Sequence, residues 1–467
     1  MPPPQGVTPC RPGRLHDQVI PFGVMRRFGL LSMAAQIPSP LHAGERRLPP
    51  DPRATEQKMV SKVKVSPDLM GGDVDEGYGK VADAFRRNLS SGQEVGAAFA
   101  VYRDGRKVVD LWGGFRNGIT QAPWEQDTLV TVFSTTKGVA SFAVAVAVSR
   151  GLLSYDARVA DYWPEFAQAG KDAITVRQLL AHQAGLSALK PPLTLNDLAE
   201  PPRMSAKLAA QAPAWTPGTR HGYHGITLGW YEGELIRRAD PAGRTLGRFF
   251  AEEIAEPLGL DFYIGLPTSV NRDRVAQLHV FSRAKLLLHL RTLPPALVLG
   301  LFNPFGLTAR SLTIAKGIKD PEIFNRDELR VIEMPAGNGT GTARSIAKLY
   351  GSAATGGSEI GLTPSTLDAL KEPAIPPTNG LRDKVLHVDM IFSLGFCKPN
   401  PEMAVFGSSA KAFGTPGAGG SFGFADPDTG IGYAYVMNKM GFHLVDPRER
   451  GLRNALFHDV LGTRPQT

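Results

Sequence analysis

One stretch, residues 131–148, constrains the fold of this chain more than any other. A β-prone Thr-Val-Phe run leads to Ser134, and the residues from there to Gly151 are mostly small or apolar and include no proline. This pattern predicts a strand or turn followed by a buried helix. Ser134 then stands at the N-terminus of that helix. Unpaired backbone N–H groups and the positive end of the helix dipole stabilise an oxyanion there.

Lys137 lies three residues after Ser134 and therefore on the same face of the predicted helix. An amine whose pKa is lowered by an apolar setting can act as a base toward a neighbouring hydroxyl. The spacing by itself is weak evidence, because Ser-x-x-Lys occurs six times in the chain. Only the copy at Ser134 leads into a helix apolar enough to be central. The stretch is thus a nucleophile with its base, or a helix with an ordinary capping serine.

Composition limits the number of domains and the kinds of partner and cofactor. At 467 residues the chain exceeds one typical core, so we expect one large domain or two closely joined ones. The net charge of +8 is too diffuse for nucleic-acid binding, and no zinc or RNA-reading motif accompanies it. Two cysteines give neither a disulfide framework nor a metal cluster. We therefore expect no metal and no organic cofactor, and no nucleic-acid partner.

Two segments lie apart from the predicted catalytic part. Residues 1–70, rich in proline and arginine near the start, are expected to be a disordered tail or an N-terminal extension, with Met59 as an alternative start. A short apolar run after Arg26-Arg27 faintly resembles a targeting segment, so a targeted or secreted form stands beside the expected cytoplasmic one. The apolar stretch 286–307 is interrupted by charges and prolines and is no membrane span. Core packing, a wall of the acyl site and contact with lipid all stay open for it.

Strands are expected toward both ends of the folded part and helices between them. Arg103-Asp-Gly-Arg106 joins two β-prone runs, and Asp426-Pro-Asp-Thr-Gly430 joins two more, which predicts two antiparallel hairpins. A further strand is expected over Met390–Phe396. The fold class is therefore α/β in the α+β sense, an antiparallel sheet flanked by helices with a mainly helical insertion. We expect one hydrolase domain over 71–465, with an α/β part over 71–165 and 335–465 and a helical part over 166–334.

Helical periodicity supports this organisation. Helices are predicted at 176–182, 203–212, 226–239, 244–256, 342–354 and 447–461.

Three motifs occur in a characteristic order. They are Ser134-Thr-Thr-Lys137, Tyr223-His-Gly225, and Thr415-Pro-Gly417 followed by Ala-Gly-Gly-Ser421. Together they resemble the serine β-lactamase and penicillin-binding-protein superfamily, and more closely its class C and family VIII carboxylesterase branch, over about residues 75 to 460. Any one motif is weak, whereas the ordered set is specific. The resemblance implies the serine β-lactamase/transpeptidase-like fold.

The resemblance also implies roles for individual residues. Ser134 is the expected nucleophile, Lys137 and Tyr223 move protons, and the N–H groups of Ser134 and Ala418 form the oxyanion hole. Gly417 lets the backbone approach the acyl group. The chain departs from the family pattern at two positions of the substrate groove, Gly225, which is usually asparagine, and Thr415, which is usually a cationic or aromatic residue.

The change at Thr415 removes a cation that helps bind the carboxylate of β-lactams in the family. We therefore expect a serine hydrolase for short- to medium-chain carboxylic esters. A β-lactamase, a D-alanyl peptidase and a scaffold that has lost turnover are the alternatives.

A competing motif is Gly419-Gly-Ser421-Phe-Gly423, which has the G-x-S-x-G spacing of α/β-hydrolases. That motif requires a strand, a sharp turn and a helix, whereas Ser421 is followed by a β-prone run. Ser421 is thus expected to begin a hairpin strand. Two histidines have non-catalytic interpretations: His182 is expected to hold a loop at a helix end, and His224 to occupy a variable position without an orienting role.

Overall fold

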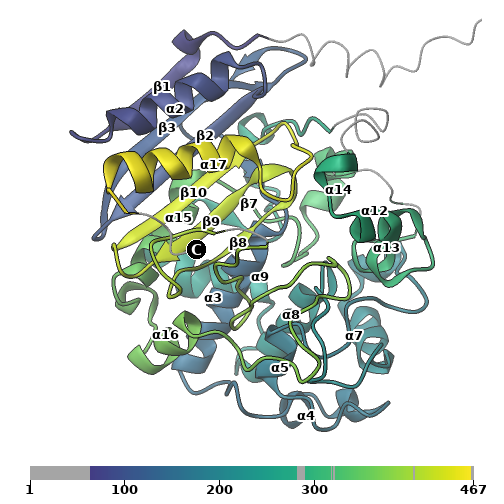
Figure 1. Cartoon of the computed structure of the whole chain (residues 1–467). Coiled ribbons are helices and arrows are strands. Elements are labelled where there is room, and N and C mark those ends of the chain that lie inside the picture. Colours follow the sequence, from purple (N-terminus) through teal and green to yellow (C-terminus); the bar gives the residue numbers. More distant parts are fainter. Residues whose placement is uncertain (1–63, 281–289, 317, 319–320, 403–404, 464–467) are drawn as a thin grey trace, which may run out of the picture. The chain divides into compact units, whose positions relative to one another are not determined.

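An antiparallel sheet built from both ends of the chain organises the fold (Figure 1). The computed structural model describes residues 64–280, 290–316, 318, 321–402 and 405–463. The strand order is β1-β3-β2-β10-β9-β8, and β4 pairs with β3. The strands are β1 (Met70–Val74), β2 (Gly96–Arg103), β3 (Arg106–Asn117), β4 (Ala122–Pro123), β8 (Phe413–Pro416), β9 (Phe422–Asp426) and β10 (Ile431–Met437). This is the α+β arrangement that the sequence predicts.

The two predicted hairpins are confirmed. Asp104 and Gly105 both have positive φ, 50° and 77°, as a two-residue turn between right-twisted strands requires. They join β2 to β3, with Val101 opposite Val109. The second hairpin joins β9 to β10, with Phe424 opposite Tyr433. Because β10 also pairs with β2, the N-terminal and C-terminal hairpins form one continuous sheet.

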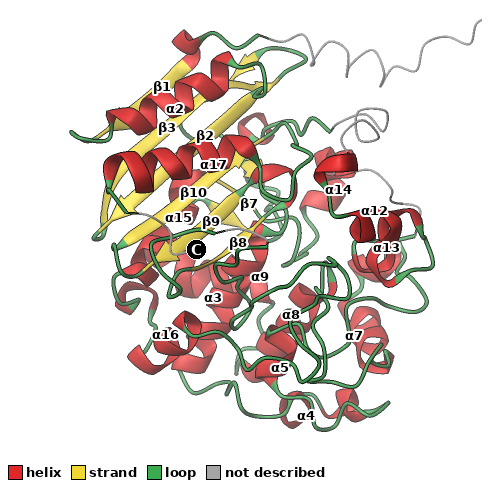
Figure 2. Ribbon diagram, in the orientation of Figure 1, coloured by secondary structure: helices red, strands yellow, loops and turns green. Residues whose placement is uncertain are grey.

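Helices cover both faces of this sheet (Figure 2). On one face, α2 (Gly79–Ser90) and α17 (Pro447–Asn454) pack over an apolar cluster in which Phe424 stacks on Tyr433 with ring centroids 4.5 Å apart. On the other face, α15 (Ala343–Ala354) crosses β2, β9 and β10. Below it lies α3 (Thr135–Ser149), whose start contacts β8.

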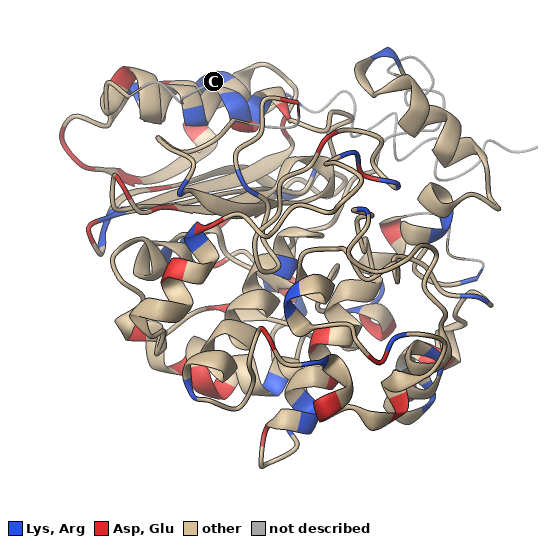
Figure 3. Ribbon diagram, turned by 60° about the horizontal axis from the view of Figure 1, so that its bottom comes forward, with Lys and Arg blue, Asp and Glu red and all other residues tan. Residues whose placement is uncertain are grey.

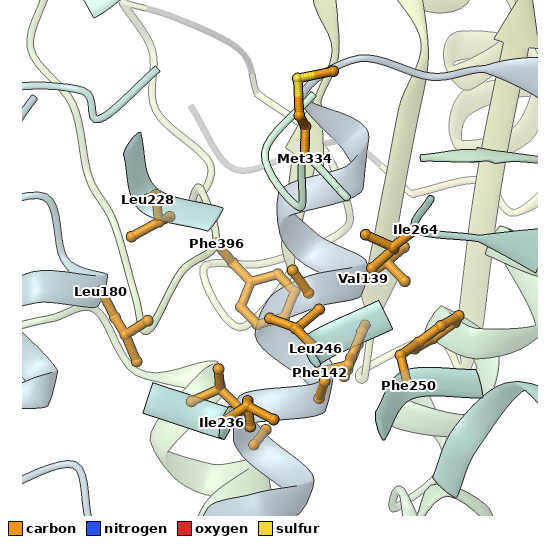
Figure 4. Packing of buried hydrophobic residues seen from close by; sticks show 14 of the residues in the cluster. Val139, Phe142, Leu180, Leu228, Ile236, Leu246, Phe250, Ile264, Met334 and Phe396 are labelled. Atoms are coloured by element: carbon orange, nitrogen blue, oxygen red, sulfur yellow. The ribbon is translucent and has the colours of Figure 1, made fainter. Parts of the chain in front are cut away.

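The helix α3 is the centre of the larger core. Residues 135–147 are all buried, including the charged Lys137. Figure 4 shows Val139 and Phe142 of α3 among side chains from several surrounding elements. Phe142 contacts Tyr350 and Phe396 edge-on, with centroids 5.1 and 5.0 Å apart. A buried helix without a polar face fixes the position of whatever stands at its N-terminus.

The middle of the chain is mainly helical, as predicted. Its helices are α4 (Val159–Tyr162), α5 (Val176–Leu180), α6 (Leu195–Ala199), α7 (Pro201–Ala210), α8 (Thr227–Ala239), α9 (Leu246–Phe250), α10 (Glu256–Leu258), α12 (Pro295–Phe302), α13 (Leu307–Ser311) and α14 (Asp327–Arg330), and α16 (Pro364–Lys371) follows later. A small second sheet has the order β5-β7-β6, with β5 (Val130–Thr131), β6 (Phe262–Tyr263) and β7 (Thr340–Gly341). The division of the domain at 166 and 334 stays a prediction.

One predicted strand is wrong. Met390–Phe396 contains an isolated bridge, Phe392 to Cys397, instead of a strand of the sheet. Its apolar residues are buried in two clusters, Met390 and Phe392 in one and Leu394 and Phe396 in the larger core, so burial without sheet pairing produced the misleading pattern.

Parts of two other predictions fall beyond what the structure describes. Residues 1–63 of the predicted tail and 286–289 of the apolar stretch lie outside the described residues. The end of the predicted tail region carries structure, because β1 starts at Met70 and pairs with β3. No helix in the described part of the chain has the length and apolarity that crossing a membrane requires.

Candidate active site

Ser134 stands on a tight turn directly before α3. Phe133 has a φ of 47°, a left-handed conformation that is costly for a bulky residue, and its ring is held edge-on by Phe324 at 5.7 Å. The Ser134 hydroxyl makes no capping hydrogen bond to the helix, although the residue is in the N-cap position. The alternative of an ordinary capping serine therefore does not describe this residue.

Lys137 is one turn further along α3 and almost completely buried, with 1% of its surface exposed. Its Nζ lies 3.0 Å from Ser134 Oγ, and it donates to the carbonyl oxygen of Gly225 at 2.6 Å and to that of Ala336 at 2.8 Å. Burial lowers the pKa of Lys137 to about 7, because charge is disfavoured away from water. A large fraction of the lysine is therefore neutral near neutral pH.

The contacts of Lys137 fix the direction of its lone pair. Carbonyl oxygens only accept hydrogen bonds, so the two hydrogens of a neutral amine point to Gly225 and Ala336. The third direction, occupied by the lone pair, is the one toward Ser134 Oγ. This arrangement suits Lys137 to act as a base toward the Ser134 hydroxyl.

Tyr223 lies near both Lys137 and the Ser134 hydroxyl. It is half-buried, and its ring centroid lies 4.9 Å from Lys137 Nζ. Burial raises the pKa of Tyr223 above its ordinary value, while the nearby Ser134 side chain opposes that shift. A neutral phenol next to the nucleophile and the lysine can pass a proton between the serine oxygen and a leaving group.

Two buried histidines hold the segment that carries Tyr223. His224 Nδ1 lies 2.7 Å from the carbonyl oxygen of Gly222, and its Nε2 accepts from the Leu186 N–H at 3.1 Å. His182 Nδ1 accepts from the His224 N–H at 3.0 Å. His182 thus holds a loop, as expected. His224 does orient its surroundings, contrary to expectation, because the backbone on both sides of it needs a buried partner.

The third motif supplies backbone close to the nucleophile. A Cβ on Gly417 would lie 2.4 Å from the Val132 carbonyl oxygen, so only glycine permits this approach. Ala418 is exposed, and among the described residues neither its N–H nor that of Ser134 donates to a protein acceptor. Two free N–H groups beside a nucleophile suit an oxyanion hole.

Ser421, the competing serine, is buried and its hydroxyl is already engaged. It donates to the Val132 carbonyl oxygen at 2.8 Å and lies 3.1 Å from Thr135 Oγ1. The strand β9 begins at the next residue, as the sequence predicts. Ser421 therefore ties the third motif to the turn that carries Ser134.

Two predicted substrate-binding residues, Thr415 and Gly225, are buried and do not line an open groove. Thr415 is 2% exposed, and its hydroxyl faces Gly138 and Tyr350 between β8 and α3, because alternate residues of a strand point to opposite faces. Gly225 is buried beside Ser311, and it contributes its carbonyl to Lys137 instead of a side chain to the groove. The Thr415 side chain is therefore not placed to touch a substrate, and Gly225 has no side chain to offer.

Sequence reasoning missed two residues of the site. Ala336 accepts from Lys137, and its loop approaches α8 so closely that a Cβ on Gly229 would lie 2.4 Å from its nitrogen. Asp383 accepts from the Tyr223 N–H at 2.8 Å through one oxygen and from the N–H groups of Val385 and Leu386 through the other. Both act from far along the chain, and no local motif marks them. Across the described residues, no group of three or more His, Cys, Asp or Glu could hold a metal ion.

Comparisons with known proteins agree with this geometry. Residues 81–456 match the family described as Beta-lactamase. The "Esterase/beta-lactamase LipL" of Mycobacterium tuberculosis is 33% identical over 79% of this chain and 83% of its own length. A crystal structure of a family VIII carboxylesterase is 39% identical over 83% of this chain and 98% of that one, with a TM-score of 0.70. A penicillin-binding-protein homologue from Caulobacter crescentus is 40% identical over 83% and 99%, with a TM-score of 0.72. This chain belongs to the Beta-lactamase family, within the serine β-lactamase and penicillin-binding-protein superfamily.

Proposed function

We propose that this chain hydrolyses short- to medium-chain carboxylic esters through an acyl-enzyme formed on Ser134. The observation that carries the proposal is the set of three contacts made by the buried Lys137 amine. Two carbonyl oxygens fix its hydrogens, and the remaining direction meets Ser134 Oγ at 3.0 Å. Similarity to proteins named as esterases supports the choice of substrate class.

In the acylation step, neutral Lys137 takes the proton from Ser134 Oγ as the oxygen attacks the ester carbonyl carbon. The N–H groups of Ser134 and Ala418 hold the oxyanion that forms. Collapse of this intermediate breaks the bond to the alcohol oxygen, which receives a proton from Tyr223, and the phenol regains one from Lys137. The products of the step are the free alcohol and an ester of Ser134.

Deacylation repeats the sequence with water. The Lys137–Tyr223 pair accepts a proton from the water that attacks the acyl carbonyl, and the same N–H groups stabilise the second oxyanion. Ser134 Oγ leaves and recovers its proton, which releases the carboxylic acid. No step requires a residue beyond Ser134, Lys137, Tyr223 and Ala418.

The experiment that tests this proposal is intact-mass analysis after parallel exposure to p-nitrophenyl butyrate, a fluorophosphonate and a penicillin. We expect a phosphonyl adduct on Ser134 and rapid release of p-nitrophenol, both absent in Ser134→Ala. A stable penicilloyl adduct or its rapid turnover would favour a D-alanyl peptidase or a β-lactamase. Absence of every adduct in the folded wild-type protein would mean a scaffold without turnover.

We also propose that the enzyme meets its substrates at a lipid surface. The α12–α13 surface, defined by Leu299, Leu301, Phe302, Phe305 and Leu312, is unusually apolar, with Leu299 73% and Phe305 89% exposed. The sequence from 281 to 319 contains six Lys or Arg and no Asp or Glu. Over the rest of the helical part, acidic and basic residues are interspersed (Figure 3). Exposed apolar side chains in a segment of sequence whose charged residues are all cations suit an anionic membrane surface.

Sedimentation with vesicles tests this contact. The wild type should bind vesicles of phosphatidylcholine with one fifth phosphatidylglycerol more strongly than pure phosphatidylcholine, since each cation near the surface contributes about 1 kcal/mol. Phe302→Ser combined with Phe305→Ser should release the protein. Ile375→Ser removes an equally exposed apolar residue, 74% exposed, from outside the surface and should change nothing. Equal binding by all three proteins would contradict the proposal.

A further inference from the structure

A small pocket lies beside the segment that follows Tyr223. It has a volume of about 130 Å³, and Ile226 and Trp230 of the α8 region form one wall. Leu193 and Ile314 form another. At about 30 Å³ per water molecule, this volume holds roughly four waters or a similarly short chain of carbon atoms.

The charged residues of this pocket are all cations. Arg310 and Lys316 line it, and no Asp or Glu of the described chain does. Arg310 donates to the Leu189 carbonyl oxygen at 2.9 Å, which occupies one of its five N–H groups. Burial lowers the pKa of Arg310, and no described carboxylate acts on it to reverse that shift. A partly buried guanidinium with spare donors is the kind of group that binds a carboxylate.

The pocket is joined to the catalytic segment through Ser311, the residue after Arg310. Ser311 Oγ donates to the Tyr223 carbonyl oxygen at 2.7 Å and accepts from the Gly225 N–H at 3.2 Å. Ser311 also lines the pocket. An anion bound at Arg310 therefore lies next to the backbone whose Gly225 carbonyl accepts from Lys137.

We infer that this pocket binds the carboxylate of a short-chain organic anion, with Arg310 on the carboxylate and the apolar walls around the carbon chain. The inference rests on the proposed esterase function for its biological meaning, because an ester hydrolase releases carboxylic acids and can act on half-esters of dicarboxylic acids. The anion is either the free acid or a distal carboxylate carried by the substrate. The binding itself does not depend on catalysis.

Calorimetric titration of Ser134→Ala with acetate, butyrate and hexanoate tests the binding directly, without turnover. Affinity should rise from acetate to hexanoate, by up to about fourfold per methylene group that is buried. Arg310→Gln in the same background should weaken hexanoate binding by about tenfold or more, as expected for a lost charge-assisted hydrogen bond. Arg291→Gln is the matched control, because Arg291 is exposed in the same basic segment and does not line the pocket.

Kinetics on the wild-type background separate the two sources of the anion. If the substrate carries it, Arg310→Gln should lower kcat/KM for a p-nitrophenyl hemiglutarate about tenfold relative to p-nitrophenyl butyrate. If the free acid is the ligand, Arg310→Gln should leave the ratio of kcat/KM for the two esters unchanged, although it weakens hexanoate binding. Hexanoate binding that is undetectable, or equal in the arginine and glutamine proteins, would overturn the inference. A folded but inactive wild type would refute the esterase proposal while leaving the titration valid.

Discussion

Burial of the Lys137 amine lowers its pKa to about 7, and the nearby Glu232 opposes this shift. In the proposed mechanism the neutral form is the base, so its population sets the rate at low pH. We expect kcat/KM for p-nitrophenyl butyrate to rise about tenfold between about pH 6 and about pH 8, following the deprotonation of a group with a pKa near 7. Measured pH–rate profiles of the wild type check this.

Tyr223→Phe is the matched control for that profile. It should lower the rate by about 10²- to 10⁴-fold, the usual contribution of a general acid, and yet keep the same acidic limb. Lys137→Ala should lower the rate by a similar factor and lose the limb. A limb that persists without Lys137 would point to another base.

Glu232 is a second buried ionisable residue near Lys137. It is fully buried, its Oε1 accepts from Ser141 Oγ at 2.7 Å, and burial raises its pKa to about 8. A carboxyl whose pKa is higher in the fold than in the unfolded chain stabilises the fold at pH values below the unfolded pKa. This stability is lost as the pH rises through the folded pKa of about 8. A glutamine cannot ionise, so Glu232→Gln should gain stability relative to the wild type between about pH 5 and about pH 9.

Urea denaturation at several pH values measures the difference. One pKa unit between the folded and the unfolded state corresponds to about 1.4 kcal/mol of unfolding free energy. Glu359→Gln, which removes an exposed carboxylate, should show no such trend. A constant difference between Glu232→Gln and the wild type would mean that Glu232 ionises as freely in the fold as in the unfolded chain.

The contact between α3 and its neighbours depends on Gly138. A Cβ at this position would lie 2.0 Å from Tyr350 Oη and 2.8 Å from Thr415 Oγ1. Gly138→Ala therefore forces α3 away from α15 and β8, although alanine is the better helix former. We expect a loss of about 1–3 kcal/mol of stability, with a drop in activity because Lys137 is the preceding residue.

A double variant separates this clash from a general defect of the helix. Tyr350→Phe removes the nearest atom, so Gly138→Ala with Tyr350→Phe should recover part of the lost stability in thermal unfolding. Gly233→Ala is the control, because Gly233 is in α8 and an added Cβ there meets no atom within 4 Å. Additive effects of the two substitutions would show that the hydroxyl and the new methyl group do not meet.

The elements that the sequence predicts well are those with a local cause. The Asp104-Gly105 turn and the apolar run of α3 each have a signal within a few residues. Thr415 was misplaced because the motif gives its position along the strand and not the face that it occupies. Ala336 and Asp383 were missed because their roles exist only after distant segments meet. Because Thr415 is buried, Thr415→Lys would not simply restore the substrate-binding cation of the family pattern.

At the scale of the whole molecule, the described fold starts a few residues before β1. Val65 is 5% exposed and packs in the cluster with α2 and α17, and β1 pairs with β3 over Met70–Val74. Among the described residues, this edge of the sheet is completed from Val65 onward. The proline- and arginine-rich sequence before Met59 contributes no predicted element.

A variant that starts at Met59 should accordingly keep the melting temperature and the butyrate esterase activity of the full chain. A second variant that starts at Gly79 removes β1 and leaves the edge of β3 and part of the apolar cluster uncovered, so it should aggregate or melt at lower temperature. Thermal unfolding and light scattering of the three proteins give the comparison. If the Met59 variant is as unstable as the Gly79 variant, residues 1–58 stabilise the body; if both equal the full chain, β1 is dispensable for the sheet.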